Sequence, residues 1–178
     1  MIQKKICMVG AFGVGKTSLV SRFVKDHYDD KYMTTVGAKI EKKQVNVDGE
    51  DVTLVLWDLA GKDSVNDIRP DLLRGSSGYI VVVDGTRAET LKTAFDLHEM
   101  ATKATAAVPF TLVVNKSDLR DRWEIADADL DQARSKQFPV VISSAKTGEG
   151  VEALFVELAA RIVRKPHGGE QSAATTAR

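Results

Sequence analysis

Residues 10–17 read Gly-Ala-Phe-Gly-Val-Gly-Lys-Thr and match the phosphate-loop pattern G-x-x-x-x-G-K-[ST] at every defined position. The loop follows an apolar run at 6–9 that is typical of a buried strand. Apolar pairs at 19–20 and 23–24 come after it, and their spacing predicts one face of a helix. This strand–loop–helix order favours a phosphate site over the alternative, a glycine-rich turn without a ligand.

Each residue type in this loop has a physical role. The glycines let consecutive backbone N–H groups turn inward around phosphate oxygens, and a helix beginning near Lys16 adds the positive end of its dipole. We expect Lys16 to reach the outer phosphates as a point charge and the Thr17 hydroxyl to ligate Mg²⁺. The residues expected to bind a nucleoside triphosphate here are Phe12, Gly13, Val14, Gly15, Lys16, Thr17 and Ser18.

Two later segments predict which base is bound. Asn115-Lys116-Ser117-Asp118 follows an apolar strand at 110–114, and open α/β sheets place ligands at such strand ends. Asp118 can accept two hydrogen bonds from guanine, N1–H and the exocyclic amine, whereas adenine offers no such donor pair. Ser143-Ser144-Ala145-Lys146 follows a strand at 140–142 and is expected to donate a backbone N–H to the guanine oxygen. Either tetrapeptide alone is weak evidence, but their order behind a phosphate loop predicts that the bound base is guanine.

Two further segments predict a metal site. Trp57-Asp58-Leu59-Ala60-Gly61 ends an alternating strand at 52–57, so Asp58 is expected beside the phosphates, holding Mg²⁺ through water. We expect Gly61 to let its backbone N–H approach a γ-phosphate. Thr35, in a polar stretch at 34–37, is the candidate for a Mg²⁺ contact made only when the γ-phosphate is present.

Taken together, these segments resemble the Ras-superfamily small GTPases from about residue 3 to residue 164. The likeness is closest to the Rab-like branch, because Trp57 precedes Asp-x-Ala-Gly and residues 32–37 are similar to that branch's first switch. The resemblance implies that Tyr28 packs on the guanine edge and the Lys116 stem covers the other side. It also implies switch regions at 30–38 and 60–75, ordered by GTP and Mg²⁺, that meet protein regulators and effectors.

Two residues depart from the family pattern, and both concern catalysis. Phe12 stands at a position that is often small, near the γ-phosphate, and Lys62 replaces the usual glutamine of switch II. Lysine has three donors and no acceptor, so Lys62 cannot accept a hydrogen bond from an attacking water, although it can neutralise phosphate charge. The catalytic candidates are therefore Lys16, Gly61 and the atypical Lys62. In the alternative, Phe12 and Lys62 face solvent and another group holds the water.

The composition agrees with one domain of ordinary size. Lys and Arg number 25, as do Asp and Glu, so the balance of charge gives no reason to expect a nucleic-acid partner. We expect a small GTPase G domain over 1–165 and a disordered polar tail over 166–178. With no long apolar run, no signal peptide and no cysteine in the tail, we expect a cytoplasmic protein without a direct membrane anchor.

The pattern of strands and helices predicts an α/β, three-layer G domain. Its sheet is expected to have six strands, mostly parallel with one antiparallel edge strand, and about five helices. The hairpin signal at 47–50 predicts the antiparallel pair. Strands are expected near 3–9, 39–47, 51–57, 79–84, 110–115 and 139–143, and helices near 16–26, 65–74, 88–104, 127–136 and 149–164.

Three other residues or clusters have simpler interpretations. Cys7 is expected to be a small buried apolar residue rather than a redox centre. His98 shares a predicted helix face with small apolar residues, which favours a packing histidine over a ligand. The acidic run at 127–131 lacks the glycine and terminal glutamate of a calcium loop, so we expect a solvated helix start.

Two functions from different classes follow from the sequence. The first is a molecular switch that binds GTP and GDP with Mg²⁺ and hydrolyses GTP slowly, as a signalling GTPase. The second is a GTP-binding interaction module with negligible hydrolysis. An ATP-dependent kinase is disfavoured, because the chain has no segment left for an acceptor-substrate lid and Asp118 favours guanine.

Overall fold

The protein is described by a computed structural model over residues 2–29, 35–61 and 68–164. Its centre is a six-stranded sheet of order β2-β3-β1-β4-β5-β6. The strands are β1 (Ile2–Gly10), β2 (Ala38–Val47), β3 (Glu50–Leu59), β4 (Gly78–Asp84), β5 (Phe110–Asn115) and β6 (Val140–Ile142). The helices are α1 (Lys16–Lys25), α2 (Glu89–Thr105), α3 (Asp127–Ser135) and α4 (Val151–Arg164), with short 3₁₀ helices η2 (Pro70–Leu73) and η3 (Ser117–Arg122).

The edge strand β2 pairs antiparallel with β3, and every other pairing in the sheet is parallel. The turn between β2 and β3 places Asp48 at φ 52° and Gly49 at φ 89°. Two successive residues with positive φ suit the twist of a tight hairpin, and an Asp-Gly pair tolerates them. The predicted fold class, a mostly parallel α/β sheet with one antiparallel edge strand, is confirmed.

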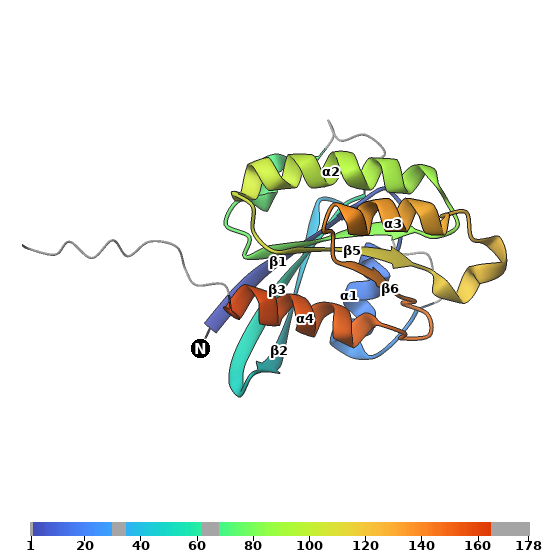
Figure 1. Ribbon diagram of the computed structural model, residues 1–178. Coiled ribbons are helices and arrows are strands. Elements are labelled where there is room, and N and C mark those ends of the chain that lie inside the picture. The colour runs from blue at the N-terminus through green and yellow to red at the C-terminus, as the bar shows by residue number, and fades with distance from the viewer. Residues whose placement is uncertain (1, 30–34, 62–67, 165–178) are drawn as a thin grey trace, which may run out of the picture.

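Helices cover both faces of the sheet, with α1 and α4 on one face and α2 and α3 on the other (Figure 1). Each face has its own apolar cluster. On the first face, Phe23 of α1 stacks on Phe155 of α4 with ring centroids 4.2 Å apart. The central strand β4 is buried along its whole length, which explains its continuous apolar sequence.

The region predicted as a helix at 65–74 differs from that expectation where it is described. Residues 62–67 lie outside the described residues, and the following part forms only the short η2, which begins at Pro70 and ends before Gly75 at φ 72°. The proline has no N–H to donate, and the glycine adopts a left-handed conformation that ends a helix. The segment η3 was not predicted. The predicted tail at 166–178 lies outside the described residues.

The simpler interpretations of single residues agree with the structure. Cys7 is fully buried, and its Sγ lies 3.1 Å from Ser76 Oγ. His98 Nδ1 lies 2.9 Å from the Tyr79 hydroxyl, and its ring centroid is 4.2 Å from that of Phe110, so it is a packing histidine. The acidic run begins α3, where Asp129 accepts a hydrogen bond from the Ala126 N–H at 3.2 Å.

No helix within residues 2–29, 35–61 and 68–164 is long and apolar enough to cross a membrane.

The topology indicates where a ligand can bind, at the edge of the sheet formed by the carboxyl ends of the parallel strands. After β1 the chain crosses through α1 toward β2 and β3, whereas after β4 it crosses through α2 toward β5 on the other side. The loops that follow β1 and β4 therefore diverge, and ligands of open α/β sheets bind at such a switch point. Every parallel strand ends at this edge.

Candidate nucleotide-binding site

The phosphate loop joins β1 to α1 at this edge. Gly15 precedes the helix at φ 102°, and no side chain of the described residues caps the first turn. The first N–H groups of α1, which point out of the start of the helix toward the loop, therefore remain available to an anion. The Lys16 side chain is only 5% exposed, and its Nζ donates to the carbonyls of Gly10 at 3.0 Å and Ala11 at 2.9 Å. The loop therefore holds a buried positive charge, which can attract an anion such as phosphate.

Two glycines of the site are required by close approach. A Cβ on Gly15 would lie 2.2 Å from Asn115 Nδ2, and one on Gly61 would lie 2.6 Å from Lys16 Nζ. No side chain larger than hydrogen fits at either position without displacing its neighbour. Gly61 therefore lies directly against the phosphate loop.

Three oxygen-bearing side chains meet beside Lys16, each from a different segment. Thr17 of α1 donates to Asp58 Oδ2 of β3 at 2.5 Å, and Thr35, which precedes β2, donates to the same oxygen at 3.0 Å. The hydroxyls of Thr17 and Thr35 are themselves 2.6 Å apart. The sequence-predicted metal residues are thus brought together.

This cluster has the chemistry of a Mg²⁺ site. Asp58 is 1% exposed, and its Oδ1 has no hydrogen-bond partner within the described residues. Burial raises the pKa of the Asp58 carboxyl, against the lowering effect of the hydroxyl hydrogen bonds and Lys16. An unsatisfied buried carboxylate oxygen beside two hydroxyls is a set of hard oxygen donors, which is what Mg²⁺ prefers. The residues present fit the ion.

A cavity of about 170 Å³ opens beside the loop. Asn115 connects its walls, because Nδ2 donates to the Val14 carbonyl at 3.1 Å and Oδ1 accepts from the Ala145 N–H at 3.1 Å. The lining residues are Gly15, Ser18, Tyr28, Asn115, Lys116, Asp118, Leu119, Ala145 and Lys146. All the residues predicted to surround the base, apart from Ser144, therefore line one cavity.

Ser144 acts on this cavity through Asp118. Its hydroxyl donates to Asp118 Oδ1 at 2.7 Å and accepts from the Thr147 N–H at 3.1 Å, which orients the carboxylate. Asp118 is exposed in the structure. A base that enters the cavity would cover it, and the carboxylate would then need both of guanine's donors.

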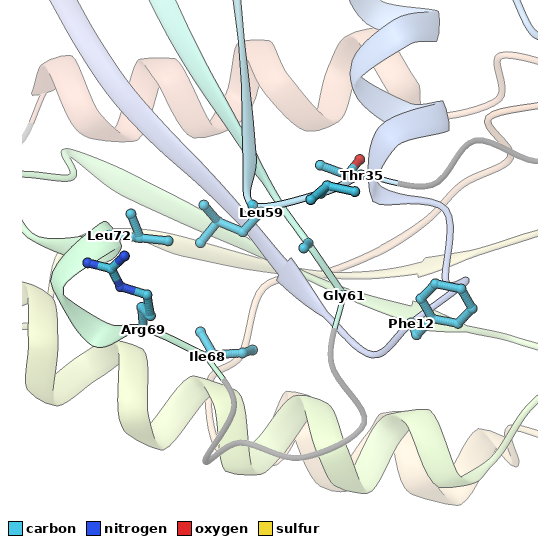
Figure 2. A pocket seen from close by; sticks show the side chains of 10 residues that line it. Phe12, Thr35, Leu59, Gly61, Ile68, Arg69 and Leu72 are labelled. Atoms are coloured by element: carbon cyan, nitrogen blue, oxygen red, sulfur yellow. The ribbon is translucent and has the colours of Figure 1, made fainter.

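On the other side of the loop lies a wider cavity of about 500 Å³. Figure 2 shows Thr35, Leu59 and Gly61 between Phe12 on one side and Ile68, Arg69 and Leu72 on the other. The Phe12 side chain is 43% exposed. Lys62, and parts of both predicted switch regions at 30–34 and 62–67, lie outside the described residues.

Two residues of the site, Asp84 and Arg87, were not predicted from the sequence. Asp84 is 1% exposed at the end of β4 and accepts from Lys116 Nζ at 2.7 Å and Arg87 Nε at 3.2 Å. Burial alone would raise the pKa of Asp84, but hydrogen bonds from Lys116 and Thr86 hold that pKa below its usual range. An acidic residue that ends an otherwise apolar strand was the available signal.

Comparison with known proteins gives a consistent result. The sequence model of the Ras family matches residues 5–164. Ras-related protein Rab-18-B of Danio rerio is 35% identical over 170 residues, which cover 94% of this chain and 83% of that protein. Ras-related protein Rab-22A of Mus musculus is 34% identical over 160 residues, covering 89% and 82%. Ras-related protein Rab-18 of Caenorhabditis briggsae is 35% identical over 164 residues, covering 91% and 81%.

Proposed function

This chain belongs to the Ras family of small GTPases, Rab-like in sequence, and we propose that within it the protein is a guanine-specific switch with slow intrinsic hydrolysis. As a family member it binds GTP and GDP with Mg²⁺, hydrolyses GTP and meets protein regulators and effectors. The observation that carries the proposal is the convergence of the phosphate loop, the Thr17–Thr35–Asp58 cluster and the Asn115–Asp118 cavity at one sheet edge.

In this proposal each group of residues has a distinct task. The loop N–H groups and Lys16 bind the phosphates, and Thr17, Thr35 and Asp58 hold Mg²⁺, with Asp58 acting through water. The ion, when bound, neutralises charge on the phosphate oxygens. Tyr28, Lys116, Asp118 and Ala145 surround the base. We propose that residues 1–165 form one G domain, which the match of the Ras family model to residues 5–164 supports.

The proposed slow hydrolysis rests on Phe12 and Lys62. A Cβ on Gly61 would lie 2.7 Å from Phe12 Cα, so the chain enters switch II directly against Phe12. Lys62 follows Gly61 and offers no acceptor for an attacking water. The exposed Phe12 ring also adds bulk where an activator's arginine would approach the phosphates. Nucleotide binding does not depend on either side chain, because the loop binds through its backbone and Lys16.

We further propose that regulators and effectors contact residues 30–38 and 60–75. The described part of this surface includes the cavity of about 500 Å³, beside which the Val36 side chain is 91% exposed. A partner of this kind suits a protein without excess positive charge, and nucleic acid does not. A cytoplasmic location suits the proposed role, because guanine nucleotides and Mg²⁺ are supplied there.

Single-turnover hydrolysis of bound GTP tests the proposal. We expect Lys62→Gln to raise the rate on the order of tenfold or more, because the glutamine amide oxygen can accept a hydrogen bond from the attacking water. Phe12→Gly removes bulk beside the phosphates and should raise the rate as well. Lys62→Arg is the matched control, since arginine also lacks an acceptor and should leave the rate low. A wild type faster than Lys62→Gln would show that Lys62 assists the reaction and would overturn the proposal. Hydrolysis absent from every variant would favour the GTP-binding module.

A further inference from the structure

Three consecutive carbonyls of the phosphate loop are each held by a side chain from elsewhere in the fold. Lys116 Nζ donates to the Gly13 carbonyl at 3.1 Å, and Asn115 Nδ2 donates to the Val14 carbonyl at 3.1 Å. The first of the three, the Phe12 carbonyl, accepts from Arg87 Nη2 at 2.6 Å. Arg87 lies just before α2, on the loop that follows β4. The two loops that diverge at the switch point are therefore joined by this one guanidinium.

Arg87 is oriented by a buried carboxylate. Its Nε lies 3.2 Å from Asp84 Oδ2, the same oxygen that accepts from Lys116 Nζ at 2.7 Å. The other oxygen of Asp84 accepts from the N–H and the hydroxyl of Thr86 at 2.9 and 2.7 Å. Asp84 is thus a fixed anion from which two cationic side chains extend to successive carbonyls of the loop. Glu89 adds only a distant contact to Arg87, at 3.9 Å.

The contact at Phe12 has a consequence on the opposite side of the loop. The peptide between Phe12 and Gly13 is trans, so its N–H points away from the carbonyl that Arg87 holds. A cation on the oxygen of a peptide polarises it and strengthens its N–H as a donor. Lys116 has the same relation to the Val14 N–H, and the neutral amide of Asn115 acts in the same sense, without a charge, on the Gly15 N–H. Arg87 thereby extends this arrangement to the start of the loop.

We propose that Arg87 is a positioning residue of the phosphate loop: through the Phe12 carbonyl it orients and polarises the Gly13 N–H toward the phosphates and so slows nucleotide release. This inference rests on the proposed site, and it concerns retention of nucleotide rather than hydrolysis. Arginine suits the role because separate N–H groups bind Asp84 and the carbonyl at once. A lysine at this position has one nitrogen for both acceptors and can replace the contact only in part.

Release of a fluorescent GDP analogue, chased with excess GDP, tests the proposal. We expect Arg87→Ala to release the nucleotide on the order of tenfold faster, which is the value of one charge-assisted hydrogen bond at a partly exposed site. Arg87→Lys should give an intermediate rate. Glu89→Gln is the matched control, because it removes the distant ion pair and leaves the bond to Phe12 intact. We expect its release rate to equal that of the wild type.

A second measurement separates positioning from a general loss of structure. In the GDP complex labelled with ¹⁵N, Arg87→Ala should shift the amide resonance of Gly13 and leave that of Gly49, in the distant β2–β3 turn, unchanged. Unchanged release from Arg87→Ala, equal acceleration by Glu89→Gln, or an unmoved Gly13 resonance would each overturn the proposal. Neither experiment measures hydrolysis, so a fast-hydrolysing wild type would overturn the proposed function alone.

Discussion

At the scale of single residues, selection of the base depends on Asp118, which Ser144 orients through a 2.7 Å hydrogen bond. Asp118→Ala removes the acceptor for both guanine donors. We expect GDP affinity to fall about 30- to 1,000-fold, or about 2–4 kcal/mol, with no loss for ADP. Calorimetric titration of both nucleotides measures this, and Ser144→Ala, which keeps the carboxylate, should lose less. Equal affinity of the wild type for GDP and ADP would contradict guanine selection.

His98 predicts a pH dependence of stability. Burial lowers the pKa of His98 below its ordinary value of 6.5, so the unfolded chain binds this proton more readily than the folded one. The contribution of neutral His98 is therefore fully present above that ordinary value and is lost as pH falls from it through the lower pKa of folded His98. Urea unfolding between about pH 5 and 7 should show a steeper acid loss for wild type than for His98→Gln. His27→Gln, at an exposed histidine, should behave as the wild type does; identical pH profiles for all three would contradict the assignment.

At the scale of elements, the two switch regions are linked at the beginning of β2 and the end of β3. The Ala60 N–H donates to the Gly37 carbonyl at 2.8 Å. Thr35, shortly before Gly37, belongs to the metal cluster, and Gly61, directly after Ala60, lies against the phosphate loop. Groups that gain partners only with a γ-phosphate should be ordered by it.

We therefore expect amides within 30–38 and 60–75 to exchange hydrogen more slowly with a non-hydrolysable GTP analogue than with GDP. Mass spectrometry of peptides from deuterated protein measures the difference. The β2–β3 turn is an internal control, since it lies far from the loop and should exchange equally in both states. Equal exchange in the switch regions as well would support a static binding module.

At the scale of the whole molecule, the Asp58 carboxylate of β3 connects that strand to α1 and to the segment before β2, through its hydrogen bonds with Thr17 and Thr35. With GDP and Mg²⁺ we expect the free energy of unfolding to rise by about 1.4 kcal/mol for each tenfold increase in free GDP above its Kd.

The Asp58→Asn variant should lose most of the Mg²⁺-dependent part of this stabilisation. Without metal and nucleotide the Asp58→Asn variant should be more stable than wild type, because it removes a buried charge, one oxygen of which has no partner within the described residues. Thermal unfolding with and without a chelator measures both effects, and stability indifferent to Mg²⁺ would contradict the metal assignment.

Local sequence determined most of the fold and the principal binding segments. The phosphate loop, the hairpin at 47–50 and the apolar strands depend on residues adjacent in the chain, such as Asp48 and Gly49, whose backbone preferences act without distant partners. Asn115–Asp118 and Ser143–Lys146 were predicted because each directly follows a strand, and parallel strands end at one edge. The extent of the helix at 65–74 was not predicted correctly where it is described, since Pro70 and Gly75 limit it.

Only the tertiary structure decided how these segments are held. Arg87 and Phe12 are 75 positions apart, and nothing near either residue in the sequence indicates that a guanidinium meets that carbonyl. Asp84 can orient both cationic side chains because the sheet register places it beside Asn115. There its buried carboxylate forms ion pairs with Lys116 and Arg87. The Asp58 oxygen that has no partner among the described residues is likewise buried only because β3 packs beside α1. Such contacts form between side chains that are distant in the sequence and come together only in the folded chain, whereas the motifs depend on spacing along the chain.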